Sequence, residues 1–312
     1  SGERSDADAG QPPMTGAGPP LAIEQLRYVR LGTTDLAAAA AFATEVLGLE
    51  SVGRSETRAA FRSDSRAETL VFVAAEAPHA AIGLELRDEA ALARAIAALG
   101  EAGVAVVPGD VADAAERRVR ALARFRDPAG SAFELVVRPP QAGTRFFPAR
   151  DAGVTGLAAV ALRCPDPMAA VAFWTGLAGA RVADWIGEGA YLAFDAARHH
   201  RLAMHEASAP GVLAVEFAVD GVDQLMRSAY LLRARQVRTA AGPGRRPASG
   251  EMFLTVHGPD GVLFSFVAEG GPRADRDAPP RQYPRALSSY CTWGSETDVP
   301  EFGGAAGPGE RA

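Results

Sequence analysis

The chain repeats itself at a fixed distance. When its 312 residues are shifted by 131 positions, the stretch DPAGSAFEL at 127–135 falls on GPDGVLFSF at 258–266. Further anchors agree at the same offset: Leu26 with Leu157, Val29 with Val160, Leu31 with Leu162, Asp35 with Asp166, Phe42 with Phe173, Gly48 with Gly179, and 84–86 with 215–217. Agreement at one constant offset indicates a duplication, so we expect two halves of similar fold.

Each half has the same predicted order of elements. A short apolar strand at 26–31 or 157–162 leads through an Asp-containing turn into a helix, and short strands follow. The pattern then restarts with IGLEL or LAVEFAV and a second helix, and a strand after a Pro/Gly turn closes the half. This order predicts an α+β fold of four βαβββ units, two in each half.

Composition and charge exclude several classes of function. A net charge of −6 argues against nucleic acid and anionic membranes as partners, and no apolar run is long enough to span a bilayer. The chain has no lysine, which excludes a Schiff-base enzyme, lysine-anchored pyridoxal phosphate and a P-loop. Its two cysteines have no metal or redox spacing, and its first twenty residues lack the apolar stretch of a secretory signal, so we expect a cytoplasmic protein.

Several stretches resemble a known superfamily. The four units with their closing hairpins, together with FRSDSRAETLVFV, VTGLAAVALRCPDPMAAVAFW, DAARHHRLAMHE and ALSSYCTWGSETDVPEF, resemble the vicinal oxygen chelate superfamily of glyoxalases, bleomycin-resistance proteins and extradiol dioxygenases. The sharper resemblance is to two-domain type I extradiol dioxygenases, over roughly residues 22–303. It implies two tandem domains, each a cup-shaped, partly open β-barrel with outer helices, and a homo-oligomer.

The resemblance also gives domain limits. A structural N-terminal domain is expected at 22–138 and the domain with the active-site cup at 155–270. The Gly/Pro-rich ends, 1–21 and 271–312, are expected to be a disordered N-terminal segment and a C-terminal tail that is poorly ordered apart from LSSYCTWG.

The Fe(II) ligands of the resembled branch are missing. That branch holds iron with two histidines and one glutamate, and these positions fall on Ala159, Ala214 and Ser265. A methyl group cannot ligate iron and a lone serine hydroxyl is a poor ligand, so no metal cofactor is expected. Two further site positions, a histidine and a tyrosine, fall on Arg246 and Thr255.

One functional residue of the branch is retained, since its acid–base histidine falls on His200. An imidazole can take a phenolic or enolic proton near neutral pH, and the alternative is a partly buried structural histidine. In a strand, His199 and His200 would point to opposite faces, and His205 would lie too far along to share a metal with His199. His199 and His205 are therefore expected to be surface or structural residues.

The remaining candidates surround this histidine. Glu216 shares a strand face with Ala214, where it could act as a second base or orient His200. Glu85 is its partner in the repeat, and that symmetry favours a structural role instead. Arg246 could hold an anionic or carbonyl-bearing ligand through its fork of donors, or be a solvated loop arginine.

Polar and aromatic residues could complete a binding cup. Thr255 and Ser265 could donate hydrogen bonds into the space that the metal ion occupies in the resembled branch, or they could only fill that space. Tyr191 and Trp185 could wall an aromatic ligand, although such aromatics are also common core residues.

These features favour an extradiol-dioxygenase-like, metal-independent enzyme. Its substrate would be a phenolic, catechol-like or polyketide-derived aromatic compound, with O₂ as a candidate second substrate and His200 as general base. The reaction could be oxygenation, ring cleavage or rearrangement. The alternatives are a non-catalytic small-molecule binding or resistance protein, and a pseudoenzyme subunit of the same fold.

Overall fold

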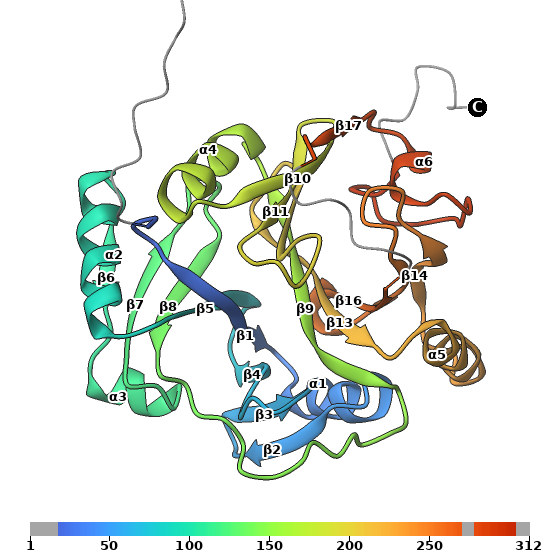
Figure 1. The fold of residues 1–312 in the computed structure, drawn as a ribbon. Coiled ribbons are helices and arrows are strands. Elements are labelled where there is room, and N and C mark those ends of the chain that lie inside the picture. Colours follow the sequence, from blue (N-terminus) through green and yellow to red (C-terminus); the bar gives the residue numbers. More distant parts are fainter. Residues whose placement is uncertain (1–17, 270–277, 304–312) are drawn as a thin grey trace, which may run out of the picture.

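Two similar α+β halves lie side by side in the computed structural model, which describes residues 18–269 and 278–303 (Figure 1). The predicted disordered segment 1–21 lies outside the described residues except for 18–21. Of these, Leu21 is fully buried, and its backbone N–H donates to the carbonyl of Leu177.

The first half contains one eight-stranded sheet, in the order β2-β3-β4-β1-β5-β8-β7-β6. Its elements are β1 (Ile23–Thr33), α1 (Leu36–Ala41), the π-helical turn η1 (Phe42–Val46), β2 (Glu50–Arg54), β3 (Arg58–Arg62), β4 (Leu70–Ala74), β5 (His79–Leu86), α2 (Glu89–Glu101), β6 (Val106–Pro108), α3 (Val111–Glu116), β7 (Ala121–Arg126) and β8 (Ala132–Val137).

The second half contains a nine-stranded sheet, in the order β14-β15-β16-β13-β9-β12-β11-β10-β17. Its elements are β9 (Val154–Cys164), α4 (Pro167–Ala178), β10 (Arg181–Ile186), β11 (Gly189–Ala193), β12 (Leu202–Glu206), β13 (Gly211–Val219), α5 (Val222–Ala234), β14 (Thr239–Arg245), β15 (Met252–His257), the 3-10 turn η2 (Pro259–Gly261), β16 (Leu263–Ala268), β17 (Arg281–Tyr283) and α6 (Leu287–Tyr290). The α+β prediction of four βαβββ units is confirmed.

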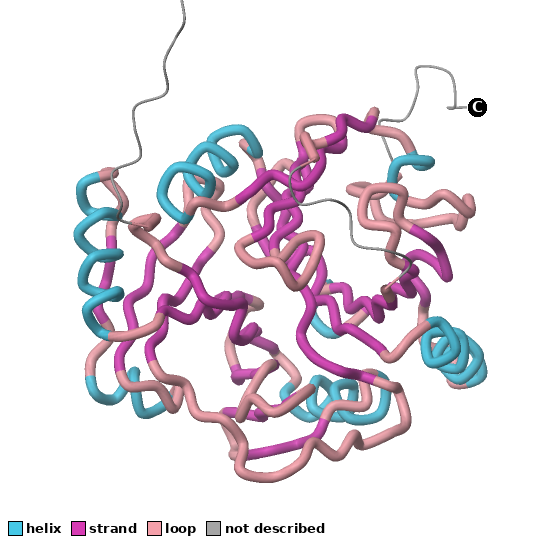
Figure 2. The backbone as a smooth tube through the Cα atoms, in the orientation of Figure 1, coloured by secondary structure: helices cyan, strands magenta, loops and turns pink. Residues whose placement is uncertain are grey.

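In each of the four units, the first and last strands pair in parallel. β1 pairs with β4 and β5 with β8 in the first half, as β9 pairs with β12 and β13 with β16 in the second. The first strands of the two units pair antiparallel at the centre of each sheet. The sheets therefore curve into open cups with helices outside (Figure 2).

Local sequence signals account for the first helix of each half. The carboxylates of Asp35 and Asp166 cap α1 and α4 by accepting from the backbone N–H three residues on. Pro167 occupies the first turn of α4, and Gly179 ends the helix in the left-handed conformation that glycine adopts without strain. The repeated Asp is thus a repeated helix start.

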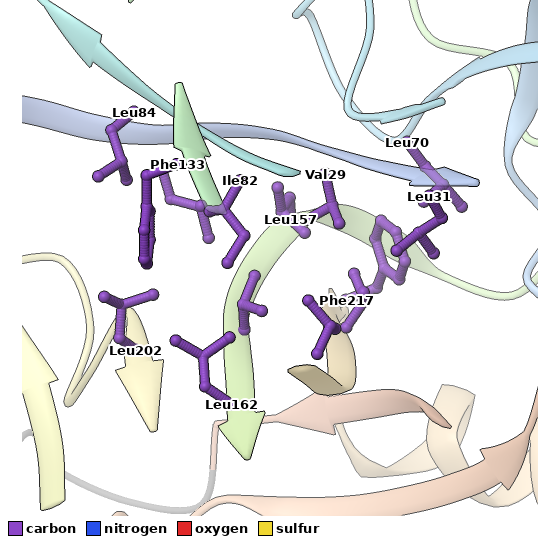
Figure 3. Packing of buried hydrophobic residues seen from close by; sticks show 14 of the residues in the cluster. Val29, Leu31, Leu70, Ile82, Leu84, Phe133, Leu157, Leu162, Leu202 and Phe217 are labelled. Carbon is purple, nitrogen blue, oxygen red and sulfur yellow. The ribbon is translucent and has the colours of Figure 1, made fainter. Parts of the chain in front are cut away.

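One core cluster joins the two halves. Trp174 on α4 is fully buried and its ring centroid lies 4.6 Å from that of Phe133 on β8. Its indole N–H donates to Asp127 of the first half, 3.2 Å away. Figure 3 shows the same cluster with Leu84 from the first half and Leu202 from the second packed in one region.

The structure corrects the repeat in one strand. Leu26 pairs with Leu84, but Leu157, 131 residues after Leu26, pairs with Phe217, which is 133 residues after Leu84. The structural counterpart of Glu216 is therefore Gly83 and not Glu85. Symmetry with Glu85, which favoured a structural role for Glu216, does not hold.

The C-terminal tail packs on the second half. β17 adds a parallel strand to β10, and α6 follows it. The stretch LSSYCTWG contains α6, and β17 lies before it in the part of the tail that the structure describes, 278–303. The preceding part of the tail, 271–277, lies outside the described residues.

Candidate functional site

A row of three residues crosses the floor of the second cup. Ala159 on β9 lies opposite Glu216 on β13, which in turn lies opposite Ser265 on β16. Ala214, two residues before Glu216, faces Ala161 in the next row. A carboxylate thus projects from between two of the positions that the resemblance gives to metal ligands.

The floor of the cup is occupied by a buried ion pair. The Arg246 guanidinium binds both oxygens of Glu216, with Nη1 at 2.9 Å and Nη2 at 2.5 Å. Glu251 lies 3.5 Å from Arg246 Nη1 and 3.2 Å from Arg198 Nη1. Burial opposes the charge of Arg246, but the neighbouring carboxylates outweigh it and raise the pKa of the guanidinium. The two positive charges of these arginines offset the two negative charges of the glutamates.

His200 lies beside this pair and is almost fully buried. Its Nε2 has no hydrogen-bond partner and lies 3.9 Å from Glu216 Oε2. Burial, with His199 and Arg246 nearby, lowers the pKa of His200 well below its usual value. The ring is therefore a neutral imidazole at pH 7.

His199 contacts His200 directly. The two Nδ1 atoms are 3.1 Å apart, and His199 Nε2 lies 2.9 Å from Asp184 Oδ2. The expectation that the two rings point to opposite faces of a strand is wrong, because β12 begins only at Leu202 and both histidines lie in the preceding loop. The His199 residue is half-buried, and its side chain is only 9% exposed.

A small cavity opens from the cup toward the tail. Thr255, Tyr191 and His205 line it from the cup, and Tyr290 and Phe302 line it from the tail. Its free volume of about 20 Å³ holds roughly one water molecule. A cavity of this size does not hold an aromatic ring.

The aromatic and polar candidates divide between cup and core. The Tyr191 ring packs edge-on against His200, with centroids 4.7 Å apart, and the Thr255 and Ser265 hydroxyls lie 2.8 Å apart. Trp185 instead packs against the main core cluster, on the other side of β10 from Asp184. His205 is buried at the cavity, which excludes a surface position for it.

The residues that the resemblance places at the ligand positions do not fit an Fe(II) ion. Ala159 and Ala214 offer only methyl groups, and the Ser265 hydroxyl is hydrogen-bonded to Thr255. These three side chains cannot form the two-histidine, one-carboxylate ligand set of an iron centre.

A different metal-ligand group is present nearby. Potential ligand atoms of His200, Glu216 and Glu251 all lie within 4.8 Å of one another. Sequence reasoning did not find Glu251, which lies in the loop before β15 and carries no motif. Both carboxylates already bind Arg246, so a divalent ion here would displace or face a guanidinium.

Comparison with known proteins places both halves in one family. The model described as glyoxalase/bleomycin resistance protein/dioxygenase superfamily matches residues 25–135, and one described as glyoxalase-like domain matches 159–267. The biphenyl-2,3-diol 1,2-dioxygenase of Paraburkholderia xenovorans (strain LB400) is 32% identical over 203 residues, which cover 59% of this chain and 67% of that protein. The chain belongs to the glyoxalase/bleomycin resistance protein/dioxygenase superfamily.

Within this superfamily the similarity is to extradiol dioxygenases. The biphenyl-2,3-diol 1,2-dioxygenase of Metapseudomonas furukawaii is 33% identical over 177 residues, covering 53% of this chain and only 57% of that protein. The crystal structure of a halotolerant catechol dioxygenase superposes with a TM-score of 0.80 at 22% identity, over 90% of this chain and 96% of that one. The predicted resemblance is confirmed, and the two-domain fold is shared.

None of the helices in 18–269 and 278–303 is both long enough and apolar enough to cross a bilayer.

Proposed function

We propose that this chain is a metal-independent enzyme that takes the O–H proton of a phenolic or enolic aromatic compound with His200. The observation that carries the proposal is the His200 Nε2 atom, buried without a partner in a cup whose iron-ligand positions are Ala, Ala and Ser. A neutral imidazole in such a place is a proton acceptor. The dioxygenase relatives make an aromatic diol the leading substrate class.

The charge balance of the cup supports independence from metal. Arg246 and Arg198 already neutralise Glu216 and Glu251. A divalent ion would add two positive charges beside two guanidinium groups in a buried site, which Coulomb repulsion disfavours. In the proposed site Arg246 is the fixed cation, and it stabilises the oxyanion left when His200 takes the proton.

Proton removal is the step common to oxygenation, ring cleavage and rearrangement. In the oxygenation case the phenolate donates one electron to O₂, and the resulting phenoxyl radical and superoxide combine to form a new C–O bond at a ring carbon. The resulting peroxide anion takes the proton back from His200. Substrate and O₂ thus give a hydroperoxide with no external reductant.

The first experiment compares wild type with His200→Ala in the presence of a chelator. The probes are 2,3-dihydroxybiphenyl and 3-methylcatechol, followed by product absorbance and an oxygen electrode. We expect turnover in wild type and a loss on the order of 10²-fold or more in the variant, with probe binding retained. His79→Ala, which removes an exposed histidine of the other half, is the control.

Metal content decides between this proposal and a metal enzyme. The protein is purified without a His-tag, incubated with Fe(II) and analysed by elemental mass spectrometry. We expect near-zero stoichiometry. One metal per chain that disappears in Glu251→Gln, with turnover restored only by metal, would refute the proposal. Probe binding without turnover in wild type would favour the binding-protein alternative.

A further inference from the structure

A buried chain of contacts leads from the edge of the second sheet to the proposed base. It runs from the Asp184 carboxylate on β10 through His199 to His200, with separations of 2.9 Å and 3.1 Å. Asp184 and His200 are 1% and 2% exposed, respectively, so water does not compete for these contacts. From the sequence, His199 was expected to be a surface or structural residue, and Asp184 was not among the candidate site residues.

The protonation of Asp184 fixes the first link. Burial would raise its pKa, but hydrogen bonds from His199 and Arg281 outweigh this and lower the pKa to about 2. An ionised carboxylate only accepts hydrogen bonds. The proton between Asp184 and His199 therefore belongs to His199 Nε2.

The second link follows from the first. In the arrangement that we infer, His199 carries a single proton, on Nε2, so its Nδ1 holds a lone pair. Two lone pairs cannot face each other at 3.1 Å, and the proton between the rings must come from His200 Nδ1. The Nε2 of His200 is then the unprotonated atom.

We propose that Asp184 and His199 are positioning residues that hold His200 in the tautomer with an Nε2 lone pair on the side of Glu216. This inference rests on the proposed function, since it explains how His200 is set as a base. The other tautomer would present an N–H at the same point and could not accept a proton. No residue of the resembled motif supplies this selection.

The tail takes part in the same chain of contacts. Arg281 on β17 donates to Asp184 Oδ1 from its backbone N at 2.8 Å and from Nε at 3.0 Å. Its Nη2 donates to Oδ2 at 2.6 Å, beside the His199 contact. The carboxylate is thus fixed in orientation by a strand that arrives 97 residues later in sequence.

This geometry makes Asp184→Asn an informative change. The two Arg281 donors on Oδ1 require an acceptor, so the amide oxygen is expected at that position. The NH₂ group then takes the position of Oδ2, where it loses the contact with the Arg281 Nη2 donor and donates to His199 Nε2. His199 would protonate at Nδ1 instead, and His200 would be forced into the Nε2–H tautomer.

The test is ¹⁵N NMR of histidine-labelled full-length protein near pH 7.5, where long-range proton–nitrogen couplings identify each tautomer. Signals are assigned with His199→Gln and His200→Gln. In wild type we expect Nε2–H on His199 and Nδ1–H on His200, and in Asp184→Asn the reverse. Arg281→Met keeps the Asp184 carboxylate and should retain the wild-type pattern.

Three results would overturn the inference. These are an Nε2–H tautomer of His200 in wild type, a doubly protonated His199, or an unchanged pattern in folded Asp184→Asn. If Asp184→Asn does not fold, the wild-type spectrum alone still decides the tautomer of His200.

Kinetics separate this inference from the proposed function. With 2,3-dihydroxybiphenyl, Asp184→Asn should lower kcat on the order of 10²-fold, with KM changed little. The expected tautomers without any turnover would leave the positioning chain intact and reject the proposed function. Turnover that requires His200 but is unaffected in Asp184→Asn would support the proposed function and reject the positioning role of Asp184 and His199.

Discussion

Acidification from pH 7 to pH 5 should destabilise this protein through its buried histidines. His205 is 5% exposed, and burial, together with the nearby Arg246, lowers its pKa to about 3. An unfolded histidine titrates near 6.5. Between these two values the unfolded state binds a proton that the folded state does not, so stability falls as the pH falls.

The size of the effect follows from the two pKa values. At pH 7 both states are mostly neutral, and the contribution is close to zero. A pH of 5 is about 1.5 units below the pKa of histidine in the unfolded state. This difference corresponds to about 2 kcal/mol of lost stability for His205 alone. His200, whose pKa is also lowered by burial, contributes in the same direction.

The assay is urea unfolding followed by tryptophan fluorescence at both pH values, in chelator, with wild type and His205→Leu. Leucine removes the titrating group and keeps an apolar side chain against Tyr290 and Phe302. The loss of unfolding free energy between pH 7 and pH 5 should be about 2 kcal/mol smaller in the variant. Between pH 7 and pH 8 the two proteins should change in parallel. An equal loss in both proteins from pH 7 to pH 5 would refute the assignment of a buried, neutral His205.

Three further changes test the packing and charge of the site, each by unfolding free energy in urea. Arg246→Leu should cost about 3–5 kcal/mol because it leaves the buried Glu216 carboxylate uncompensated, and the double variant with Glu216→Leu should recover most of this; no recovery would argue against a paired role. Asp184→Asn should cost about 2 kcal/mol at pH 7, since its carboxyl pKa lies near 2 instead of 3.8, and the cost should shrink as the pH falls below 4; a cost independent of pH would contradict the ion pairing. Trp174→Ala should cost about 3–5 kcal/mol because the ring packs against Phe133 in the core shared by the halves; a cost below 1 kcal/mol would show that this contact is not essential.

The fold was accessible from sequence because its signals are local and duplicated. Asp35 and Asp166 each start a helix, and the alternation of strands and helices between them is regular. The one error in the repeat, at β13, arose because shifts of 131 and 133 both place apolar residues on the core side of a strand. Only the pairing with β9 distinguishes them.

The site was accessible only in part. His200, Arg246 and Glu216 were named from the sequence, and the structure brings them together. Glu251 and Asp184 were not named, because Glu251 lies in a loop without a motif and Asp184 is held by Arg281, which lies 97 residues away in sequence. Contacts between segments so far apart leave no local pattern in a single sequence.

The aromatic candidates show a related limit. Trp185 and Tyr191 belong to adjacent strands, but the pairing of β10 with β11 is irregular between Val182 and Asp184. An extra residue in one strand alters which side chains face the cup. The strand pattern alone could not place Trp185 against the core.

The two-residue slip of β13 shows how a duplicated protein can acquire a site in one copy only. Because side chains alternate with a period of two, an even-numbered slip leaves the buried face apolar and the fold intact. It nevertheless exchanges the residue in the central row, so that Glu216 stands where the first half has Gly83. An insertion or deletion of two residues in a distant loop can therefore change the chemistry of a cup while every strand stays in place.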